Sequence, residues 1–160
     1  MRHLVRAIAF GVFGMAVLSG QVLALEACPA GKEGKSPFQA PTAPNGTEFT
    51  NILGVMDLSK ETVMLKDHTL RIRTVTVSPG GIIPLHNHAD RPAFFFMKNG
   101  SLTLFRQDCT VPQVLKEGDV SPEGKGTVHW ARNDGKEFAI LLVTDVVHTP
   151  SMDKEKKEHM

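Results

Sequence analysis

The stretch PGGIIPLHNHADRPAFFFMKNG, residues Pro79–Gly100, carries the strongest structural signals of this 160-residue chain. It places His86 and His88 one residue apart, shortly after a pair of glycines. Successive side chains of a β-strand point to opposite faces, so the two histidines are expected on the same side of one strand. Two imidazoles placed in this way can chelate one metal ion. The stretch therefore predicts a β-strand that carries part of a metal site.

Strand patterns continue on both sides of this stretch. Residues 69–77 alternate between two faces, one with Leu70, Ile72, Thr74 and Thr76 and the other with Arg71, Arg73, Val75 and Val77. AFFFMK ends at the Asn99-Gly100 pair and SLTLFR follows it, which predicts a β-hairpin. Further strands are expected in VPQVLK, in TVHWA and in FAILLVTDVV, whose continuous apolar run belongs at the centre of a sheet. No segment has an apolar helical stripe longer than two turns, which favours an all-β sandwich or barrel.

A third histidine, His129, lies in the later segment GDVSPEGKGTVHWARN and completes the site if its strand lies beside that of His86. Three imidazoles with an open position are an established arrangement for zinc and suit other first-row metals. Glu123 is a candidate additional ligand, against the simpler interpretation of a surface or turn-capping residue. No ligand-spaced cluster contains His68, His148 or His159. These three histidines are expected to be structural or exposed.

Parity also predicts the surroundings of the histidines. If Ala93 faces them, Phe95 and Met97 share its side and line an apolar cavity or plain core. Phe94 and Phe96 are then expected to pack behind the sheet.

Two other predictions concern residues beside the histidines. Trp130 has the opposite parity to His129 and is expected in an interface or an outer layer. Asp90 and Arg91 could pair with each other at the mouth of the fold, or Arg91 could bind a substrate anion.

The landmarks of these segments together resemble the two motifs of the cupin superfamily. The first motif is matched by Gly80, His86, His88 and Gly100, and the second by Gly118, Asp119, Gly126, His129 and Asn133. The resemblance covers about residues 69–148. It implies a small antiparallel jelly-roll barrel, the cupin double-stranded β-helix, whose lumen holds a divalent transition metal: zinc, copper, iron, manganese or nickel. HADRPAFFFMKNG, DCTVPQVLKEGDVSPE and HWARN look most like short exported bacterial cupins of the type-2 conserved-barrel group, which implies no particular activity.

The chain departs from the cupin pattern at two positions. Cupins that bind metal through three histidines and a carboxylate carry a Glu separated by six residues from the hairpin glycine, and here that position is Ala93. Gly124 takes the place of the second motif's proline, while Pro122 precedes it. The first change removes a ligand, so a bound metal keeps its full charge and favours anionic ligands. Cupin thiol dioxygenases also use three histidines without that Glu, so Ala93 neither excludes nor demands catalysis.

The N-terminus has the organisation of a secretory signal peptide. A basic start, MRHLVR, precedes the apolar run 7–18 and the ending VLA at Ala24. This run is shorter than the roughly 20 residues that span a bilayer, so cleavage after Ala24 is favoured over a membrane anchor. A lipoprotein cut before Cys28 is the minority alternative. The protein is therefore expected to be periplasmic or secreted, with no stable membrane anchor.

The expected organisation is a single domain with two extensions. A signal peptide occupies 1–24, an extended arm rich in Pro and Gly 25–45, the barrel 46–148, and a charged, disordered tail 149–160. Cys28 and Cys109 are the only cysteines, and an even count in an oxidising compartment favours one disulfide between arm and barrel. A thiol nucleophile is the alternative.

Three functions remain open on the sequence alone. The preferred one is an exported metal-binding cupin with a three-histidine site in the barrel lumen, which binds or acts on a small molecule. The second is a mononuclear-metal dioxygenase or isomerase, which needs a redox metal or a positioned acid/base pair. The third is a non-catalytic ligand-binding or dimerising cupin module without metal. A homodimer is compatible with each, whereas the absence of Gly-rich phosphate loops and basic stripes argues against nucleic acid.

Overall fold

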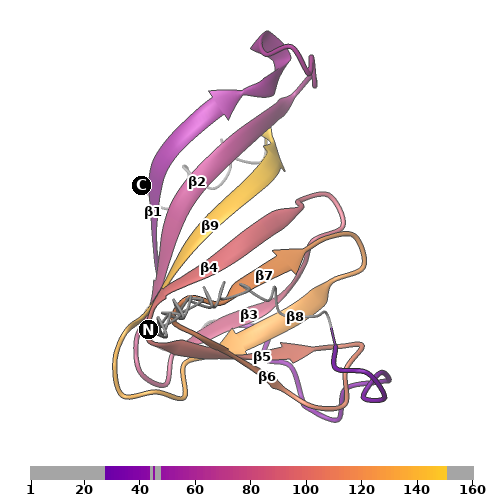
Figure 1. Cartoon of the computed structure of the whole chain (residues 1–160), viewed down its shortest axis with the longest axis vertical. Coiled ribbons are helices and arrows are strands. Elements are labelled where there is room, and N and C mark those ends of the chain that lie inside the picture. The colour runs from indigo at the N-terminus through magenta and orange to yellow at the C-terminus, as the bar shows by residue number, and fades with distance from the viewer. Residues whose placement is uncertain (1–27, 44, 46–47, 151–160) are drawn as a thin grey trace, which may run out of the picture.

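The computed structural model describes residues 28–43, 45 and 48–150, and in it two antiparallel β-sheets face each other (Figure 1). The five-stranded sheet contains, in spatial order, β1 (Glu48–Asp57), β2 (His68–Val77), β9 (Ala139–His148), β4 (Ala93–Asn99) and β7 (Val120–Glu123). The four-stranded sheet contains β3 (Ile82–Asn87), β8 (Val128–Arg132), β5 (Ser101–Arg106) and β6 (Gln113–Lys116). A 3-10 turn, η1 (Leu58–Lys60), follows β1.

This arrangement is a jelly roll, so the all-β class and the antiparallel jelly-roll architecture are confirmed. The two sheets are not closed into one continuous barrel: they lie close together at β4 and β7 and diverge toward β1 and β2 (Figure 1). The predicted signal peptide and most of the charged tail lie outside the described residues. Within the part of the chain that is described, no helix is long and apolar enough to cross a membrane.

The alternation of β2 selects its buried face. Thr69, Arg71, Val75 and Val77 are buried, whereas Leu70 and the other residues of the opposite face are only partly covered. The face that turns inward therefore mixes valines with arginines. The valines join the main core, which is filled from both sheets by Met97, Leu102, Leu104, Leu115, Leu141 and Val143.

The predicted hairpin at Asn99-Gly100 is wrong, although the turn is present. β4 pairs with β7 and β9, while β5 pairs with β6 and β8, so the turn connects the two sheets. Both strands carry buried apolar residues on one face, and the connection across the core lets these faces pack against each other. Gly100 has a φ of 73°, and a Cβ atom there would lie 2.8 Å from the carbonyl oxygen of Phe138, so the turn requires glycine.

Two strands show why sequence patterns succeed or fail. β9 lies between β2 and β4, as its continuous apolar run predicts. β1 escapes prediction because a register shift between Ile52 and Gly54 interrupts its alternation.

The arm before β1 is fixed to the outside of the four-stranded sheet. Cys28 and Cys109 form a disulfide with a Cα–Cα distance of 5.7 Å, so the predicted bond is confirmed. The backbone N–H groups of Gly34 and Ser36 donate to the carbonyls of residues 108 and 107, each at 3.0 Å.

Aromatic rings continue this contact. The Phe38 ring meets the Phe105 ring edge-on with centroids 5.1 Å apart, and Phe105 stacks on Trp130 at 3.9 Å. Trp130 therefore lies in an outer layer, as its parity predicts.

Candidate metal centre

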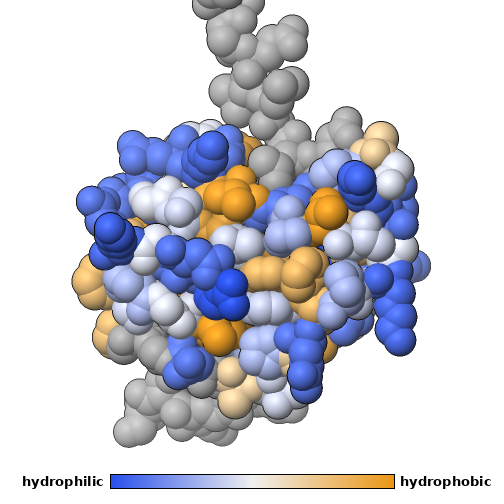
Figure 2. Space-filling view, turned by 90° about the horizontal axis from the view of Figure 1, so that it is seen from below, coloured by the Kyte–Doolittle hydropathy of each residue, from blue (hydrophilic) through white to orange (hydrophobic). Residues whose placement is uncertain are grey.

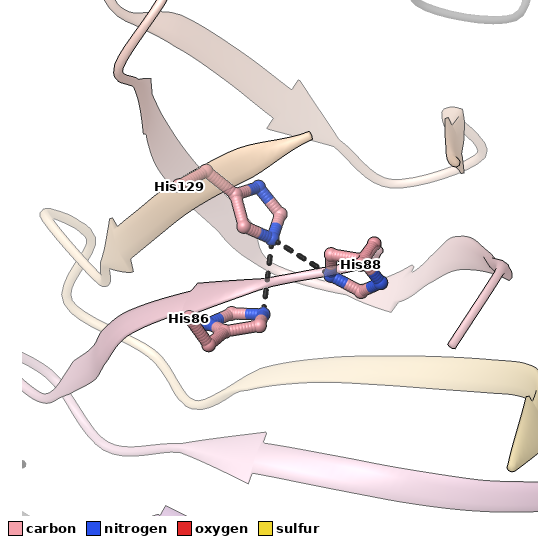
Figure 3. A group of neighbouring side chains, drawn as sticks. All are labelled: His86, His88 and His129. Carbon is pink, nitrogen blue, oxygen red and sulfur yellow. Dashed lines mark hydrogen bonds between the residues drawn. The ribbon is translucent and has the colours of Figure 1, made fainter. Parts of the chain in front are cut away.

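The three predicted histidines meet between the two sheets (Figure 3). His86 on β3 stands opposite His129 on β8, and His88 is the first residue after β3. The Nε2 atom of His129 lies 3.0 Å from that of His86 and 3.2 Å from that of His88. Zn–N bonds of about 2.0–2.1 Å at tetrahedral angles would separate ligand nitrogens by about 3.3 Å. These two separations are thus close to what one small cation needs, and all three ligand atoms lie within 4.8 Å of one another.

Backbone carbonyls fix the orientation of two of the rings. The Nδ1–H of His86 donates to the carbonyl of Pro84 at 2.9 Å, and the Nδ1–H of His88 donates to the carbonyl of Arg91 at 3.0 Å. A carbonyl only accepts, so each proton sits on Nδ1 and each Nε2 of a neutral ring is a bare acceptor. His129 can donate one Nε2 proton to one of them at most. The arrangement therefore fits a cation that all three lone pairs bind.

Burial keeps the rings neutral. Desolvation is the largest cause that lowers the pKa of His86, and it lowers the pKa of His88 to about 4. The pKa of His129 falls well below its ordinary value, again mainly through desolvation and then through the neighbouring histidines. Neutral imidazole is the form that binds metals. The three rings are therefore ready to act as ligands at neutral pH.

Glu123 lies on the other side of His129, away from the shared nitrogens. Its Oε1 is 3.9 Å from Nδ1 of His129 and accepts a hydrogen bond from Ser121 Oγ at 2.7 Å. Arg106 approaches Oε2 at 3.6 Å, yet neither Oε2 nor His129 Nδ1 has a hydrogen-bond partner among the residues that the structure describes. Burial raises the pKa of the Glu123 carboxyl, against the opposing effects of Ser121 and Arg106. Glu123 is thus neither a surface residue nor part of the three-nitrogen cluster: it lies behind one ligand.

Ala93 occupies the position where cupins carry a carboxylate ligand, and buried carboxylates flank it on both sides. The register of β4 pairs Ala93 with Glu123 on β7 and with Asp145 on β9. Both acids are buried. The acidic groups of this part of the sheet therefore come from the neighbouring strands instead of β4.

The predicted apolar lining is present on one face of β4 only. Ala93, Phe95 and Met97 are buried, and the Phe95 ring lies 5.6 Å from the His88 ring and stacks on that of His129 at 5.9 Å, between centroids. The prediction that Phe94 and Phe96 pack behind the sheet is wrong, because they are 59% and 40% exposed. No described layer covers the outer face of β4 at these two side chains.

A buried ionic group faces the histidines from the five-stranded sheet. Arg71 donates to Asp145 through Nε and Nη2, each at 2.9 Å, and both side chains are inaccessible to solvent. Nε of Arg73 lies 3.6 Å from the same carboxylate. The sequence offered one signal for this group: the arginines of 69–77 share a face with two valines, and valines select the core.

The motif residue Asn133 has a structural role, and the other described histidines lie away from the cluster. Asn133 is buried, and its Nδ2 donates to the carbonyls of Val77 and Glu137 at 2.9 and 2.8 Å. His68 and His148 stand opposite each other on β2 and β9, away from the cluster, and their ring centroids are 5.5 Å apart. His159 lies outside the described residues.

Comparisons with known proteins identify the same fold in the sequence. Residues 73–145 match the family model described as a cupin domain. Germin-like protein 1 of Brassica napus is 32% identical over 79 residues, which make up 48% of this chain and 38% of that protein. The chain thus spans well under half the length of this curated relative.

Two solved structures are similar in fold. The Cnp3 cupin domain of Schizosaccharomyces pombe has a TM-score of 0.50 at 16% identity, and the match covers 72% of this chain and 75% of that one. A predicted oxalate decarboxylase of Thermotoga maritima has a TM-score of 0.52 at 16% identity, with 68% and 90% covered. At such identities the likeness concerns the fold alone. The matched family model, together with the motif spacing and this architecture, identifies residues 73–145 as a cupin domain.

Proposed function

We propose that this chain is an exported metal-binding cupin in which His86, His88 and His129 hold a divalent transition metal, and that it binds or acts on a small molecule there. The observation that carries the proposal is the convergence of three Nε2 atoms. Those of His86 and His88 lie 3.0 and 3.2 Å from that of His129, and both are bare acceptors. For a metal loaded outside the cytoplasm, the Irving–Williams order favours zinc or copper over iron. Manganese and nickel are the other candidates.

The residues around this site would orient the ligands and leave one side open. Carbonyls of Pro84 and Arg91 hold two imidazoles in place, and Ala93 contributes no carboxylate. The bound metal would supply a Lewis acid that keeps its full dipositive charge. His86 is the partly exposed member of the cluster, so a small molecule can reach the site from its side.

Metal analysis of protein purified from the periplasm tests this proposal. We expect about one equivalent of zinc or copper per chain. His129→Ala should lose most of the metal affinity, while His148→Ala, outside the cluster, should retain it. A parent protein without metal, or a His129→Ala variant that binds metal as the parent does, would contradict the proposal.

The same analysis separates the alternatives. Bound iron would favour the dioxygenase or isomerase, which needs a redox metal and the coordination position that Ala93 leaves without a carboxylate. A metal-free protein that still folds would favour the non-catalytic binding or dimerising module.

Export is part of the proposal, and the disulfide supports it. Such bonds persist in oxidising compartments, and Cys28–Cys109 is formed. The intact mass of the exported protein should correspond to loss of residues 1–24. Recovery of the full-length chain in the membrane fraction would contradict cleavage.

We further propose that two copies associate through β1. This strand is an edge of its sheet, and apolar side chains on both of its faces are exposed: Val55 by 58% and Met56 by 48%. An uncovered apolar edge is a template for pairing with another chain. By contrast, the face on the side of the four-stranded sheet has its apolar residues in patches separated by polar ones (Figure 2).

Sedimentation over a range of concentrations tests this association. Val55→Asp should shift the parent dimer to monomer. Val114→Asp is the matched control, because Val114 is 48% exposed on β6, the edge strand of the other sheet. A monomeric parent, or equal effects of the two substitutions, would overturn the proposal.

A further inference from the structure

One carboxylate on the inner face of the five-stranded sheet, that of Asp145, is shared by two arginines. Arg71 and Arg73 both contact Asp145, the first in a bidentate pair at 2.9 Å and the second at 3.6 Å. Glu123, which pairs with Ala93 in the same row as Asp145, lies 3.6 Å from Arg106 of β5 in the other sheet, and Arg106 also pairs with Asp108 at 3.0 Å. The group formed by Arg71, Arg73 and Asp145 thus carries one more positive than negative charge, whereas Arg106 is shared between two carboxylates.

Arg73 is the member of this group that solvent can reach. Its side chain is 12% exposed, compared with 1% for Arg71 and 0% for Asp145. It occupies the inward face of β2 one row beyond Arg71, in register with Val143 of β9, which in turn pairs with Phe95. Phe95 touches the rings of two of the histidines, so Arg73 shares a row with the apolar wall of the site.

The charges also act on the histidines themselves. Arg91 and Arg73 each lower the pKa of His86, in addition to the larger effect of burial. Asp145 acts on His88, where it opposes the effect of burial on the pKa. The position of Arg73 beside the site follows from the register, which places it in the row of Phe95, whose ring contacts two of the histidines.

We propose that the ligand of this site is a small organic carboxylate, bound with one oxygen on the metal and the other facing the Arg73 guanidinium. The inference rests on the proposed metal site. Three neutral histidines leave a divalent ion without any compensating protein charge, and Ala93 removes the carboxylate that would supply it. An anion supplies that charge, and Arg73 orients it by charge-assisted hydrogen bonds. Phe95 favours a ligand whose remaining part is apolar.

Cobalt(II) provides a test that does not depend on activity. The protein loaded with Co²⁺ is titrated with acetate and benzoate, and in parallel with their neutral analogues acetamide and benzamide, while visible absorption reports coordination. We expect the carboxylates to change the spectrum and the amides to leave it unchanged. Benzoate should bind more tightly than acetate because of Phe95.

Substitution of Arg73 locates the second contact. Arg73→Gln should bind Co²⁺ as the parent does but lose about tenfold or more in carboxylate affinity, as for the loss of a hydrogen bond to a charged group. Arg73→Lys should recover part of the affinity. Arg132→Gln, which removes an exposed arginine paired with Asp134, is the control and should bind both as the parent does.

The outcomes distinguish failure of the proposed metal site from failure of the proposed carboxylate site. If the parent binds no Co²⁺, the proposed metal site fails and the carboxylate site falls with it. If the parent binds Co²⁺ but takes up amides as readily as carboxylates, or if Arg73→Gln binds carboxylates as the parent does, only the present inference is overturned. Should Arg73→Gln fail to fold by circular dichroism, Arg73→Lys and the carboxylate-to-amide comparison on the parent decide it.

Discussion

At the scale of single residues, Ala93 is the informative departure from the cupin pattern. It stands in register between the buried carboxylates of Glu123 and Asp145. A glutamate at this position would add a third carboxylate to the row, and like charges directly opposite each other in a sheet are destabilising. A bound metal ion would stabilise the carboxylate of a glutamate at this position by its positive charge.

Ala93→Glu is therefore expected to behave differently with and without metal. Without metal it should lower the free energy of unfolding by more than the roughly 1–3 kcal/mol that overpacking alone costs. Ala93→Gln, equal in size but neutral, measures that steric part. Thermal unfolding should show a larger metal-induced increase in Tm for the Glu variant than for the Gln variant. Equal increases would mean that position 93 does not face the metal.

The depressed pKa values of the histidines predict how the metal-free protein responds to acid. Histidine has a pKa near 6.5 in the unfolded chain, and the pKa of His88 is about 4 in the fold. Between these values the unfolded state binds more protons, so stability is full above about pH 7 and falls as the pH drops toward 4. The raised pKa of the Glu123 carboxyl has the opposite effect on stability. It concerns one group, whereas the pKa values of three imidazoles are lowered.

Urea unfolding in the presence of a chelator, from pH 7.5 to 4.5, measures this dependence. The slope should be smaller in His129→Ala, which removes a buried imidazole whose pKa lies well below its ordinary value, and His148→Ala, outside the cluster, is the matched variant. A stability that is constant over this range would show that the rings are solvated in solution.

At the scale of elements, the turn at Asn99-Gly100 carries the chain from the five-stranded sheet to the four-stranded sheet. Its glycine adopts a positive φ and lies against the carbonyl of Phe138, at the beginning of β9, while Asn99 donates to the same carbonyl at 2.9 Å. The turn therefore connects three strands, two of the five-stranded sheet and one of the four-stranded sheet.

Gly100→Ala should destabilise the protein by about 1–3 kcal/mol, because alanine is strained at this φ and its Cβ meets backbone that cannot move aside. Gly124→Ala is the control, since a Cβ at Gly124 has no heavy atom within 4 Å and its φ lies outside the strained range. Chemical unfolding of both variants gives the comparison. Equal effects would show that the turn does not require glycine at position 100.

Local patterns predicted which residues turn inward but not which strands pair. The period of two placed Ala93, Phe95 and Met97 on one face, and it brought His86 and His88 to the same side as expected. The Asn-Gly pair signalled a turn correctly, yet a turn does not state whether its strands join one sheet or cross to another. That choice depends on how the buried faces pack, which involves distant residues.

The charged residues of the interior were harder to predict. The sequence favours a surface position for Glu123 because ionised side chains are rarely buried, and only the register of β7 beside β4 places it on the inner face. The alternation pattern also does not predict that Phe94 and Phe96 are exposed, because it assumes that every large apolar residue is buried.

At the scale of the whole molecule, one covalent bond joins the arm to the jelly roll. The disulfide closes a loop of 81 residues that contains β1 to β5. By the chain-entropy relation such a loop is worth about 4 kcal/mol. Replacement of both cysteines by serine should therefore lower the unfolding free energy by about that amount, as measured in urea. Phe38→Ala, which removes the arm's aromatic contact but keeps the bond, should cost much less if the bond carries the effect.

The positions of the two ends also determine how the molecule carries a mechanical load. A pull on the chain before residue 28 passes through the disulfide to Cys109 and so into the connection between β5 and β6, bypassing β1 altogether. A pull on the chain after residue 148 acts on β9, which is hydrogen-bonded to a neighbour on each side in the other sheet. Tension between the two ends therefore acts to separate the sheets, and the side chains packed between them resist it. If the chain were held at both ends and pulled, the packed layer that contains the three histidines would thus be strained before an edge strand separated.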